Sequence, residues 1–382
     1  MKKLRVGVIY GGRSGEHEVS LASAAAVFKN LDPARYEGVP ILITKEGRWS
    51  VPAQPPALEA AADAIAAART PALAATTREA HLVAHPGGDT LLTIDRSSTG
   101  SALTGGAVSG LALDVMFPVL HGPYGEDGTV QGLLELANVP YVGDGVLASA
   151  VGMDKAVMKL VFAAKGLPIC EYEVVLARDW RRDERAILTH VAGRLGFPVF
   201  VKPANLGSSV GISKATHAIE LRAAIALAAE FDRKIVIEAA VPAAREIECA
   251  VLGNDEPEAS VPGEIIPSRE FYDYHAKYLD AGSRSVIPAA LTEAQTEDVR
   301  RLAIAAFKAI DGAGLARVDF LLAGDSGVLY VNELNTIPGF TTISMYAKLW
   351  DATGVSYSQL LDRLIDLAIE RHAEKQRLRT SL

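Results

Sequence analysis

Residues 316–341 read ARVDFLLAGDSGVLYVNELNTIPGFT. Apolar and β-branched residues dominate both halves of this stretch, and a glycine-containing turn separates them, so it predicts two adjacent strands of a β-hairpin. Side chains alternate between the faces of a strand, which places Arg317 and Asp319 on one face of the first strand. Glu333 and Asn335 share a face of the second strand for the same reason. The stretch therefore gathers polar side chains on single faces of an otherwise apolar hairpin.

The length of the turn decides whether these polar faces meet. A three-residue loop, with Gly327 in the left-handed position of a bulge, places Asp319 opposite Glu333. A two-residue loop instead pairs Asp319 with Asn332 and turns Glu333 to the opposite face. In the first register, two carboxylates, a carboxamide and an arginine converge, and such oxygen donors suit Mg²⁺. An ordinary aspartate–arginine ion pair is the simpler interpretation of these side chains. The following turn, residues 336–341, favours a binding site instead, because it offers backbone N–H donors beside them.

Two other loops are candidates for binding charged groups. GGRSGE (11–16) follows an apolar run and opens a helix, where backbone amides and the helix dipole favour a negative group. It lacks the spacing of a dinucleotide-binding loop, and Glu16 there suits an amine better than a phosphate, unless it is simply a solvated acid. KPANLGSSVG (202–211) begins with Lys202 and resembles a phosphate-covering lid, although a plain hairpin with an exposed lysine is equally compatible.

The composition describes a globular chain. Its 382 residues suffice for two or three domains, and 49% are hydrophobic while 22% are charged. The net charge of −8, with acids and bases interspersed, gives no reason to expect a nucleic-acid partner. The N-terminus begins a strand and not a signal peptide, and no apolar run approaches the ~20 residues that span a bilayer, so a cytoplasmic protein without a membrane partner is expected. Cys170 and Cys249 are predicted to be buried free thiols.

Three units are expected along the chain, in an α/β and α+β architecture. Residues 1–143 alternate strand-like runs with a helix, as in a Rossmann-like domain with a parallel sheet. Residues 144–237 combine helices with short strands of antiparallel pattern, which predicts a small α+β unit. Residues 238–382 hold the hairpin described above, together with two amphipathic helices.

Particular elements within these units are predicted from capping and periodicity. Asp154 is a good N-cap for a helix that ends at Gly166. A strand is expected over residues 209–214 and a long helix over residues 292–310. The segment 51–110, rich in Ala, Pro and Gly, is interpreted as a peripheral elaboration with one helix near residues 57–69.

Eight motifs occur in an order that resembles the D-alanine–D-alanine ligases of the ATP-grasp superfamily. They are GGRSGEHEVS (11–20), LHGPYGEDGT (120–129), MDK (153–155), KPANLGSSVGISK (202–214), EAAVPAAREIE (238–248), FYDYHAKY (271–278), RVDF (317–320) and NELNTIPGFTTIS (332–344). One such motif is moderately specific, whereas eight in this order are very specific. The resemblance spans nearly the whole chain, is weakest in the Ala/Pro-rich segment, and implies an ATP-grasp fold.

The resemblance implies ATP as a cofactor and assigns residues to it. Lys155 and Lys202 are expected at the phosphates, Glu238 and Val241 at the adenine, and Glu246 at the ribose. The residue after Glu238 is an alanine where many family members carry a lysine, so the chain departs from the family pattern at the expected adenine contact.

The resemblance also implies two Mg²⁺ ions, for which Mn²⁺ could substitute, bound by Asp319, Glu333 and Asn335. Arg317 and the backbone amide of Gly339 are expected to form the oxyanion site. An oxyanion is stabilised most by donors that are already in place when the negative charge develops, so these two positions matter most for the rate.

The substrate side of the site is implied in the same way. Glu16 is expected to hold the ammonium of a first D-alanine, with His121 nearby, and Lys277 and Ser344 to take the carboxylate of a second. Two residues of a mobile lid are expected to reach that glutamate by hydrogen bonds: Ser208 and Tyr278. A lid is needed because an acyl-phosphate hydrolyses when water enters.

The function implied is ATP-dependent joining of two D-alanines through a D-alanyl phosphate, for peptidoglycan precursor synthesis, by an enzyme expected to be a homodimer. D-lactate or D-serine as the second substrate is the nearest alternative, and Tyr278 favours D-alanine. Another carboxylate–amine ligase of the superfamily is a farther alternative, against which Glu16 and the tyrosine-rich loop argue. A non-catalytic nucleotide-binding regulator would be expected to lose Arg317 or a magnesium ligand, and none is lost.

Overall fold

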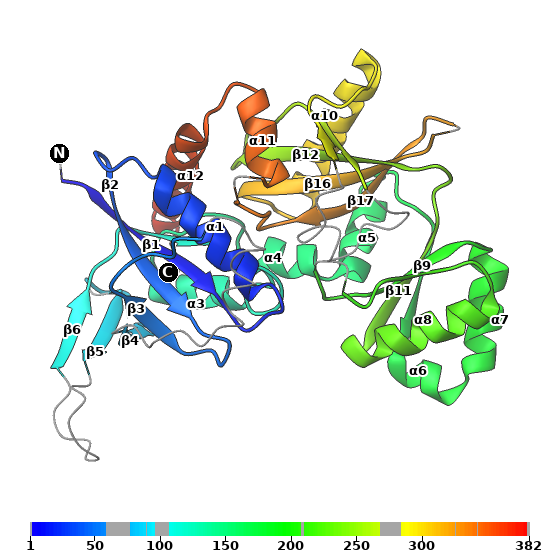
Figure 1. The fold of residues 1–382 in the computed structure, drawn as a ribbon, viewed down its shortest axis with the longest axis horizontal. Coiled ribbons are helices and arrows are strands. Elements are labelled where there is room, and N and C mark those ends of the chain that lie inside the picture. Colours follow the sequence, from blue (N-terminus) through cyan, green and yellow to red (C-terminus); the bar gives the residue numbers. More distant parts are fainter. Residues whose placement is uncertain are drawn as a thin grey trace.

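The computed structural model describes residues 2–58, 77–88, 90–95, 107–207, 210–267, 284–324, 326–341 and 343–379. Three β-sheets, each with its own helices, make up the molecule, and the sheet that contains β12, β16 and β17 lies between the other two (Figure 1). The chain runs from the N-terminal sheet to the small sheet at the far end and then returns to the middle. This return brings the C-terminal helix α12 beside the N-terminal helix α1.

The N-terminal sheet has the strand order β6-β5-β4-β3-β2-β1-β7. Its parallel part consists of β1 (Leu4–Gly11), β2 (Tyr36–Ile43) and β7 (Val115–Pro118). The helices α1 (His17–Asn30) and α3 (Thr129–Ala137) follow β1 and β7. Because the loops after β1 and β7 leave the same edge of a parallel pair, Glu16 and His121 are brought together there.

The segment 51–110 is more than the peripheral elaboration that its composition predicts. It extends the sheet with antiparallel strands: β3 (Trp49–Pro52), β4 (Thr77–Leu82), β5 (Leu91–Asp95) and β6 (Ala107–Leu111). The sheet is therefore mixed, with parallel strands only around β1. The helix expected near residues 57–69 lies almost entirely outside the described residues.

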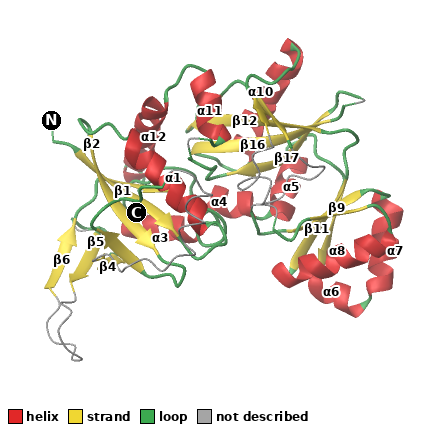
Figure 2. Ribbon diagram, in the orientation of Figure 1, coloured by secondary structure: helices red, strands yellow, loops and turns green. Residues whose placement is uncertain are grey.

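The small antiparallel sheet has the order β10-β9-β11-β8. Its strands are β8 (Tyr172–Leu176), β9 (Val199–Pro203), β10 (Ser213–Ala215) and β11 (Lys234–Ala239). One face is covered by α6 (Ala177–Arg182), α7 (Glu184–Leu195) and α8 (Ala218–Phe231), as Figure 2 shows. The strand predicted over residues 209–214 begins only at Ser213, because Gly211 adopts a positive φ of 71° that an extended strand does not allow.

Two helices connect the N-terminal sheet with this small sheet. They are α4 (Val146–Met153) and α5 (Lys155–Ala164). The predicted N-cap is confirmed, since the Asp154 carboxylate accepts hydrogen bonds from the amides of Ala156 and Val157. Gly166, with a φ of +70°, follows the helix end as expected. The cap fixes where α5 begins and thus the orientation of Lys155 in its first turn.

The middle sheet has the order β15-β14-β12-β16-β17, and β13 pairs with β12. Its strands are β12 (Arg245–Gly253), β13 (Glu258–Ala259), β14 (Gly263–Ile266), β15 (Arg284–Val286), β16 (Gly314–Leu322) and β17 (Leu329–Asn335). The predicted long helix is α10 (Glu293–Ala309), which starts with a capping box at Thr292. The chain closes with α11 (Met345–Ala352) and α12 (Tyr357–Gln376).

The hairpin of β16 and β17 has the register that the site requires, but the predicted reason is wrong. Next to the turn, Phe320 pairs with Val331, and Ala323 N donates to Val328 O, which closes a four-residue turn. Continued unchanged, that register would pair Asp319 with Asn332. A bulge at Asn332 shifts it, so that Asp319 pairs with Glu333. Gly327 is in the left-handed conformation as expected, with φ +70°, but the bulge restores the register.

The N-terminal and middle units share one hydrophobic core. It joins Val8 and Phe117 of the first sheet to Phe340, Trp350 and the apolar face of α12. The small sheet and its helices have a separate core. Cys170 and Cys249 are buried free thiols, as predicted. Among the described residues, no helix has the length and apolar character needed to cross a membrane.

Candidate active site

Three carboxylates lie in a row across adjacent strands of the middle sheet. Glu248 on β12 pairs with Asp319 on β16, which pairs with Glu333 on β17. Arg317 lies one step along the same face and donates through Nε and Nη2 to both oxygens of Asp319, each at 2.7 Å. Its Nε is also 3.1 Å from Glu248 Oε2. Burial works against the charged guanidinium, but the surrounding carboxylates outweigh it and raise the pKa of Arg317.

Asn335 completes this group. Its side-chain Nδ2 donates to Asp319 Oδ2 at 3.0 Å, on the face that Arg317 and Asp319 share. Asp319, Glu333 and Asn335 thus present two carboxylates and one amide oxygen to a common face. Within the described residues, no group of three or more His, Cys, Asp or Glu side chains is arranged as a metal site. The expected metal site contains only two such side chains, the carboxylates of Asp319 and Glu333, because its third donor is an asparagine. It would therefore not form a group of this kind.

Lysines face these carboxylates from the opposite side. Lys155, in the first turn of α5, has its Nζ 3.8 Å from Glu333 Oε2 and donates to Leu206 O at 2.7 Å. Lys202 lies on the face of β9 that points away from the covering helices, and its Nζ donates to Glu238 Oε2 at 2.7 Å and to Asn332 Oδ1 at 3.4 Å. The side chains of the small sheet therefore reach the bulge residue of the middle sheet directly.

A third lysine, which is fully buried, reinforces the contact between the two sheets. Lys159, with 1% exposure, lies one helical turn after Lys155, and its Nζ is 3.0 Å from Glu238 Oε1 and 3.4 Å from Asn332 O. Burial opposes ionisation of Glu238, but the two lysines lower the pKa of its carboxyl to about 2. The Glu238 carboxylate in turn outweighs the burial of Lys202 and raises the pKa of that ammonium. Each of these charges is stable in the interior only because the others are present.

A cavity of about 50 Å³ lies between the two sheets. Its lining includes Lys155, Gly207, Glu333 and Asn335. Around it, four described cationic side chains are paired with four carboxyl groups: Lys155, Lys159, Lys202 and Arg317 with Glu238, Glu248, Asp319 and Glu333. Incoming phosphates and cations would therefore exchange partners with groups that are already in place.

The N-terminal unit closes this site from the side of Glu16, which is 9% exposed at the start of α1. A Cβ built on Gly122 or on Gly207 would lie 2.9 Å from Glu16 Oε2 and would displace the carboxylate, and Gly122 in addition has a φ of +73° that favours glycine. Glu126 lies close by and accepts from Gly122 N at 2.8 Å. Burial, assisted by the negative charge of Glu16, raises the pKa of Glu126 to about 8. Near neutral pH, Glu126 is therefore an uncharged neighbour of Glu16.

The turn that carries Gly339 lies between β17 and α11. A Cβ at Gly339 would lie 2.9 Å from Ser344 Oγ, so a larger residue here would displace the Ser344 hydroxyl. Ser344 Oγ accepts from Thr341 N at 3.0 Å and is 2.7 Å from Thr341 Oγ1. His121, 5% exposed, approaches the turn from the N-terminal unit, and its Nδ1 is 3.1 Å from Ile337 O. The amide-rich turn and the N-terminal loops are thus in direct contact.

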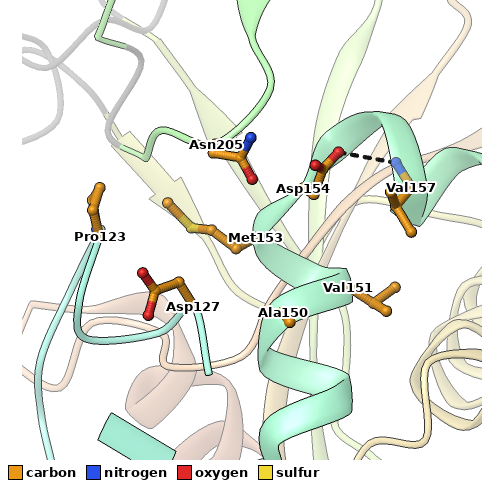
Figure 3. Close-up of a pocket in the computed structure, with 8 residues that line it drawn as sticks. All are labelled: Pro123, Asp127, Ala150, Val151, Met153, Asp154, Val157 and Asn205. Atoms are coloured by element: carbon orange, nitrogen blue, oxygen red, sulfur yellow. Dashed lines mark hydrogen bonds between the residues drawn. The ribbon is translucent and has the colours of Figure 1, made fainter. Parts of the chain in front are cut away.

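A larger pocket of about 500 Å³ opens beside this cavity (Figure 3). Met153 lines both spaces, and the other walls come from the loop with Pro123 and from Asn205. Its two acids are already engaged, because Asp127 accepts from the amides of Tyr124 and Thr129 while Asp154 caps α5. With its carboxylates committed to backbone amides, this pocket lacks the convergent charges of the smaller cavity and is the weaker candidate for chemistry.

Most of the residues expected in the site are described, and the structure brings them to one region between the three sheets. They are Glu16, His121, Lys155, Lys202, Glu238, Val241, Glu246, Arg317, Asp319, Glu333, Asn335, Gly339 and Ser344. Glu246 shares the polar face of β12 with Glu248, and Val241 lies two residues beyond the end of β11. Three expected residues lie outside the described part of the chain: Ser208, Lys277 and Tyr278.

The sequence analysis missed several polar residues of this region. Glu248 could have been found, because it follows Glu246 by two positions and therefore shares its strand face. Lys159 follows Lys155 by four positions on one helix, which is also a readable spacing. Asn332 gives no such signal, because it faces the lysines only through the bulge. Glu126 could be suspected only from its motif.

A small antiparallel sheet that presents lysines to the acidic, arginine-bearing face of a second antiparallel sheet defines an ATP-grasp enzyme. The profile described as "D-ala D-ala ligase N-terminus" matches residues 5–144, and "D-ala D-ala ligase C-terminus" matches residues 161–366. The chain belongs to the D-alanine–D-alanine ligase family.

Named relatives agree with this assignment. A protein of Geobacillus thermodenitrificans named D-alanine–D-alanine ligase is 50% identical over 376 residues, which cover 98% of each chain. A protein of the same name from Heliobacterium modesticaldum is 50% identical over 379 residues, 99% of this chain and 98% of the relative.

Solved structures show the same architecture. The D-alanine–D-alanine ligase of Coxiella burnetii superimposes with a TM-score of 0.81 at 36% identity, covering 99% of this chain and 97% of that one. The VanG D-Ala:D-Ser ligase of Enterococcus faecalis superimposes with a TM-score of 0.80 at 34% identity, covering 96% of this chain and all of the other.

Proposed function

We propose that this enzyme uses ATP to join two D-alanines through a D-alanyl phosphate, as a step in building peptidoglycan precursors. The observation that carries the proposal is the convergence of Asp319, Glu333, Asn335 and Arg317 on one face, opposite Lys155 and Lys202. A carboxylate oxygen is a poor leaving group, so an amide does not form from it directly in water. Transfer of a phosphoryl group makes phosphate the leaving group, and this transfer needs positioned charges more than covalent help from the protein.

Lys155 and Lys202 are the groups proposed to bind the ATP phosphates. Both reach the space beside Glu333 and Asn332 from the small sheet and its leading helix. Glu238 and Val241 are proposed at the adenine and Glu246 at the ribose. Since the Glu238 carboxylate is held by Lys159 and Lys202, the adenine contact would come from the backbone of residues 238–241.

Asp319, Glu333 and Asn335 are proposed to hold two Mg²⁺ ions, with Mn²⁺ as a substitute. Hard oxygen donors in small number, with room for phosphate oxygens and water, are the ligands that Mg²⁺ accepts. When bound, the ions would neutralise the charge of the transferring phosphoryl group. Arg317 and Lys155 now neutralise the same carboxylates, which supports the view that these residues are arranged for exchangeable cations.

The substrate contacts follow from the other walls of the site. Glu16 is proposed to hold the ammonium of the first D-alanine, with His121 behind it. Arg317 and the Gly339 amide are proposed to stabilise the oxyanion formed when the second amine attacks. Contacts with Asp319 and Glu248 already hold the guanidinium of Arg317 in place. Ser344 is proposed, with Lys277, to take the carboxylate of the second D-alanine.

The loop after β9 is proposed to act as part of a lid, with Ser208 and Tyr278 bonding to Glu16. The close fit of Gly207 against Glu16 supports this, because the neighbouring residue would then be within reach. Closure would exclude water from the acyl-phosphate. Protease cleavage within residues 271–285 should fall when ATP and D-alanine are added, and equal cleavage with and without them would contradict closure.

Three units, 1–143, 144–237 and 238–382, are proposed as the working domains, supported by the three separate sheets. A homodimer in the cytoplasm is proposed as the working form. Size-exclusion chromatography with light scattering would test the dimer, and a monomer at micromolar concentration would refute it.

One incubation tests the function directly. The enzyme is mixed with ATP, Mg²⁺, D-alanine and an equal amount of D-lactate or D-serine, and phosphate release and product mass are measured. D-Alanyl-D-alanine as the main product is expected, with ADP formed in equal amount. A mixed product with D-serine would favour the specificity for which the VanG D-Ala:D-Ser ligase is named. ADP formation without any dipeptide or depsipeptide would refute the ligase assignment. Tyr278→Phe should shift the ratio toward D-lactate, and an unchanged ratio would remove Tyr278 from the specificity argument.

A further inference from the structure

The backbone turn that carries Gly339 is held at both ends by side chains of the N-terminal unit. On one side, the amide of Phe340 donates to Ser23 Oγ at 3.3 Å. On the other, His121 Nδ1 lies 3.1 Å from Ile337 O. Ser23 Oγ and His121 Nε2 are 3.2 Å apart, which closes the ring of contacts around the turn. The ring joins three segments that are far apart in sequence, at Ser23, His121 and residues 337–340, so only the folded chain assembles it.

The directions of these hydrogen bonds follow from the groups involved. A carbonyl oxygen can only accept, so His121 Nδ1 carries the proton and donates to Ile337 O. A neutral imidazole then has an accepting Nε2, which takes the Ser23 hydroxyl proton, and the Ser23 oxygen accepts from Phe340 N–H. Burial lowers the pKa of His121, against the opposing effect of Glu16, which agrees with a neutral ring. Each donor in the ring has an acceptor, and neither Ser23 nor His121 has an easy alternative partner in water, because Ser23 is 0% and His121 5% exposed.

The remaining atoms of Phe340 are fixed as well. Its carbonyl oxygen accepts from Tyr357 Oη at 2.5 Å, and its ring packs edge-on against Phe117 of β7, with centroids 5.9 Å apart. Residues on either side of Gly339 are therefore anchored, one by His121 through Ile337 and one by Ser23 and Tyr357 through Phe340. The Gly339 peptide between them has little freedom to move.

We propose that Ser23 is a positioning residue for the reaction, which together with His121 orients the Gly339 amide toward the developing oxyanion. This rests on the proposed role of the Gly339 amide as an oxyanion donor. Ser23 touches neither substrate nor nucleotide in the arrangement proposed above; it acts through Phe340 N–H. In this arrangement His121 has a function besides its proximity to the first D-alanine, because its imidazole links Ser23 to Ile337 at the other end of the turn.

The test compares Ser23→Ala with a matched control, Thr90→Val. Thr90 is also buried in the N-terminal unit, and its Oγ1 donates to Leu113 O at 3.3 Å and accepts from Leu113 N at 3.1 Å, so the control also removes two hydrogen bonds. Leu113 precedes β7, at the opposite end of the strand from His121. The two variants should lose thermal stability to a similar extent, which separates stability from positioning.

The kinetic outcome distinguishes them. Ser23→Ala should lower kcat about 10- to 100-fold, because a donor displaced by a fraction of an ångström stabilises the transition state poorly, while KM for ATP stays within about twofold. Ser23→Cys, of similar shape but with weaker hydrogen bonds, should lie between Ser23→Ala and the wild type. Thr90→Val should keep wild-type kcat. The Cys variant also serves if the Ala variant does not fold.

Wild-type kcat in both Ser23→Ala and Ser23→Cys would overturn the role of Ser23. A loss of kcat and ATP affinity in both variants and in Thr90→Val, in proportion to the decrease in Tm of each, would overturn it too, because the effect would then follow stability alone. Failure of the underlying assignment looks different. In that case Arg317→Lys would also keep its turnover, or the wild type would form no D-alanine-dependent ADP. Loss of activity in Arg317→Lys with full activity in Ser23→Ala would reject the role of Ser23 alone.

Discussion

The buried lysine Lys159 offers a quantitative test of the charge cluster between the two sheets. Lys159→Met keeps the length and most of the volume of the side chain but removes its ammonium. The variant loses an ion pair of 3.0 Å to Glu238 Oε1 and a hydrogen bond of 3.4 Å to Asn332 O. Glu238 is only 3% exposed, so water cannot replace the ion pair that its Oε1 loses, whereas Asn332 is partly exposed.

The expected cost follows from these contacts. Removing one partner of a buried ion pair typically costs about 3–5 kcal/mol, because the other charge is left uncompensated. Here Lys202 still holds the second oxygen of Glu238 at 2.7 Å, so we expect a smaller loss of about 2–4 kcal/mol in the free energy of unfolding. For a chain of 382 residues that corresponds to a fall in Tm of about 2–5 °C. KM for ATP should also rise, because the phosphate-binding region loses one positive charge.

Differential scanning fluorimetry and steady-state kinetics measure the two effects. The control is Lys165→Met, at the exposed end of the same helix, which should change stability by no more than about 0.5 kcal/mol. If Lys159→Met shifts Tm no further than Lys165→Met, the buried cluster does not contribute to stability as described. If Tm falls but KM for ATP does not change, Lys159 is structural only and its link to nucleotide binding is wrong.

Three further predictions concern the site itself. Glu333→Gln should abolish dipeptide formation while leaving the circular dichroism spectrum unchanged, because the amide cannot replace a charged ligand; residual turnover above about 1% of wild type would remove Glu333 from the metal site. The raised pKa of Glu126, about 8 against 4.5 in the unfolded chain, means that the folded protein binds this proton more tightly, so its stability falls as the pH rises from about 5 to 8. Glu126→Gln, which stays neutral, should therefore raise Tm at about pH 8.5 more than at about pH 5, and an equal change at both would contradict the pKa shift. Gly207→Ala should raise KM for D-alanine about tenfold or more, because its Cβ would lie 2.9 Å from Glu16 Oε2, and an unchanged KM would show that the loop relaxes at no cost.

The sequence alone determined the features that depend on nearby residues. The alternation of Arg317 and Asp319 with apolar neighbours, the cap at Asp154 and the long helix from Thr292 to Ile310 all follow from interactions within a few positions, and all are present. The order of eight motifs was enough to identify the family, because many short patterns in one sequence rarely coincide by chance.

The tertiary structure decided what depends on contacts between distant segments. The register that pairs Asp319 with Glu333 was expected from the turn but arises from a bulge at Asn332. That residue is contacted by Lys159 and Lys202, which lie 173 and 130 positions earlier in the chain. Turn length and residue type cannot reveal such a shift, because the contacts that accompany it come from another sheet.

The strands added by residues 49–111 and the ring around the Gly339 turn belong to the same category. Antiparallel pairing of weakly patterned strands is selected by the sheet edge that β2 offers, which composition does not disclose. Ser23 and Phe340 are 317 positions apart, and nothing local to either predicts that they meet. Local chemistry thus specified the elements and many of the reactive residues, while packing between units specified how those residues face one another.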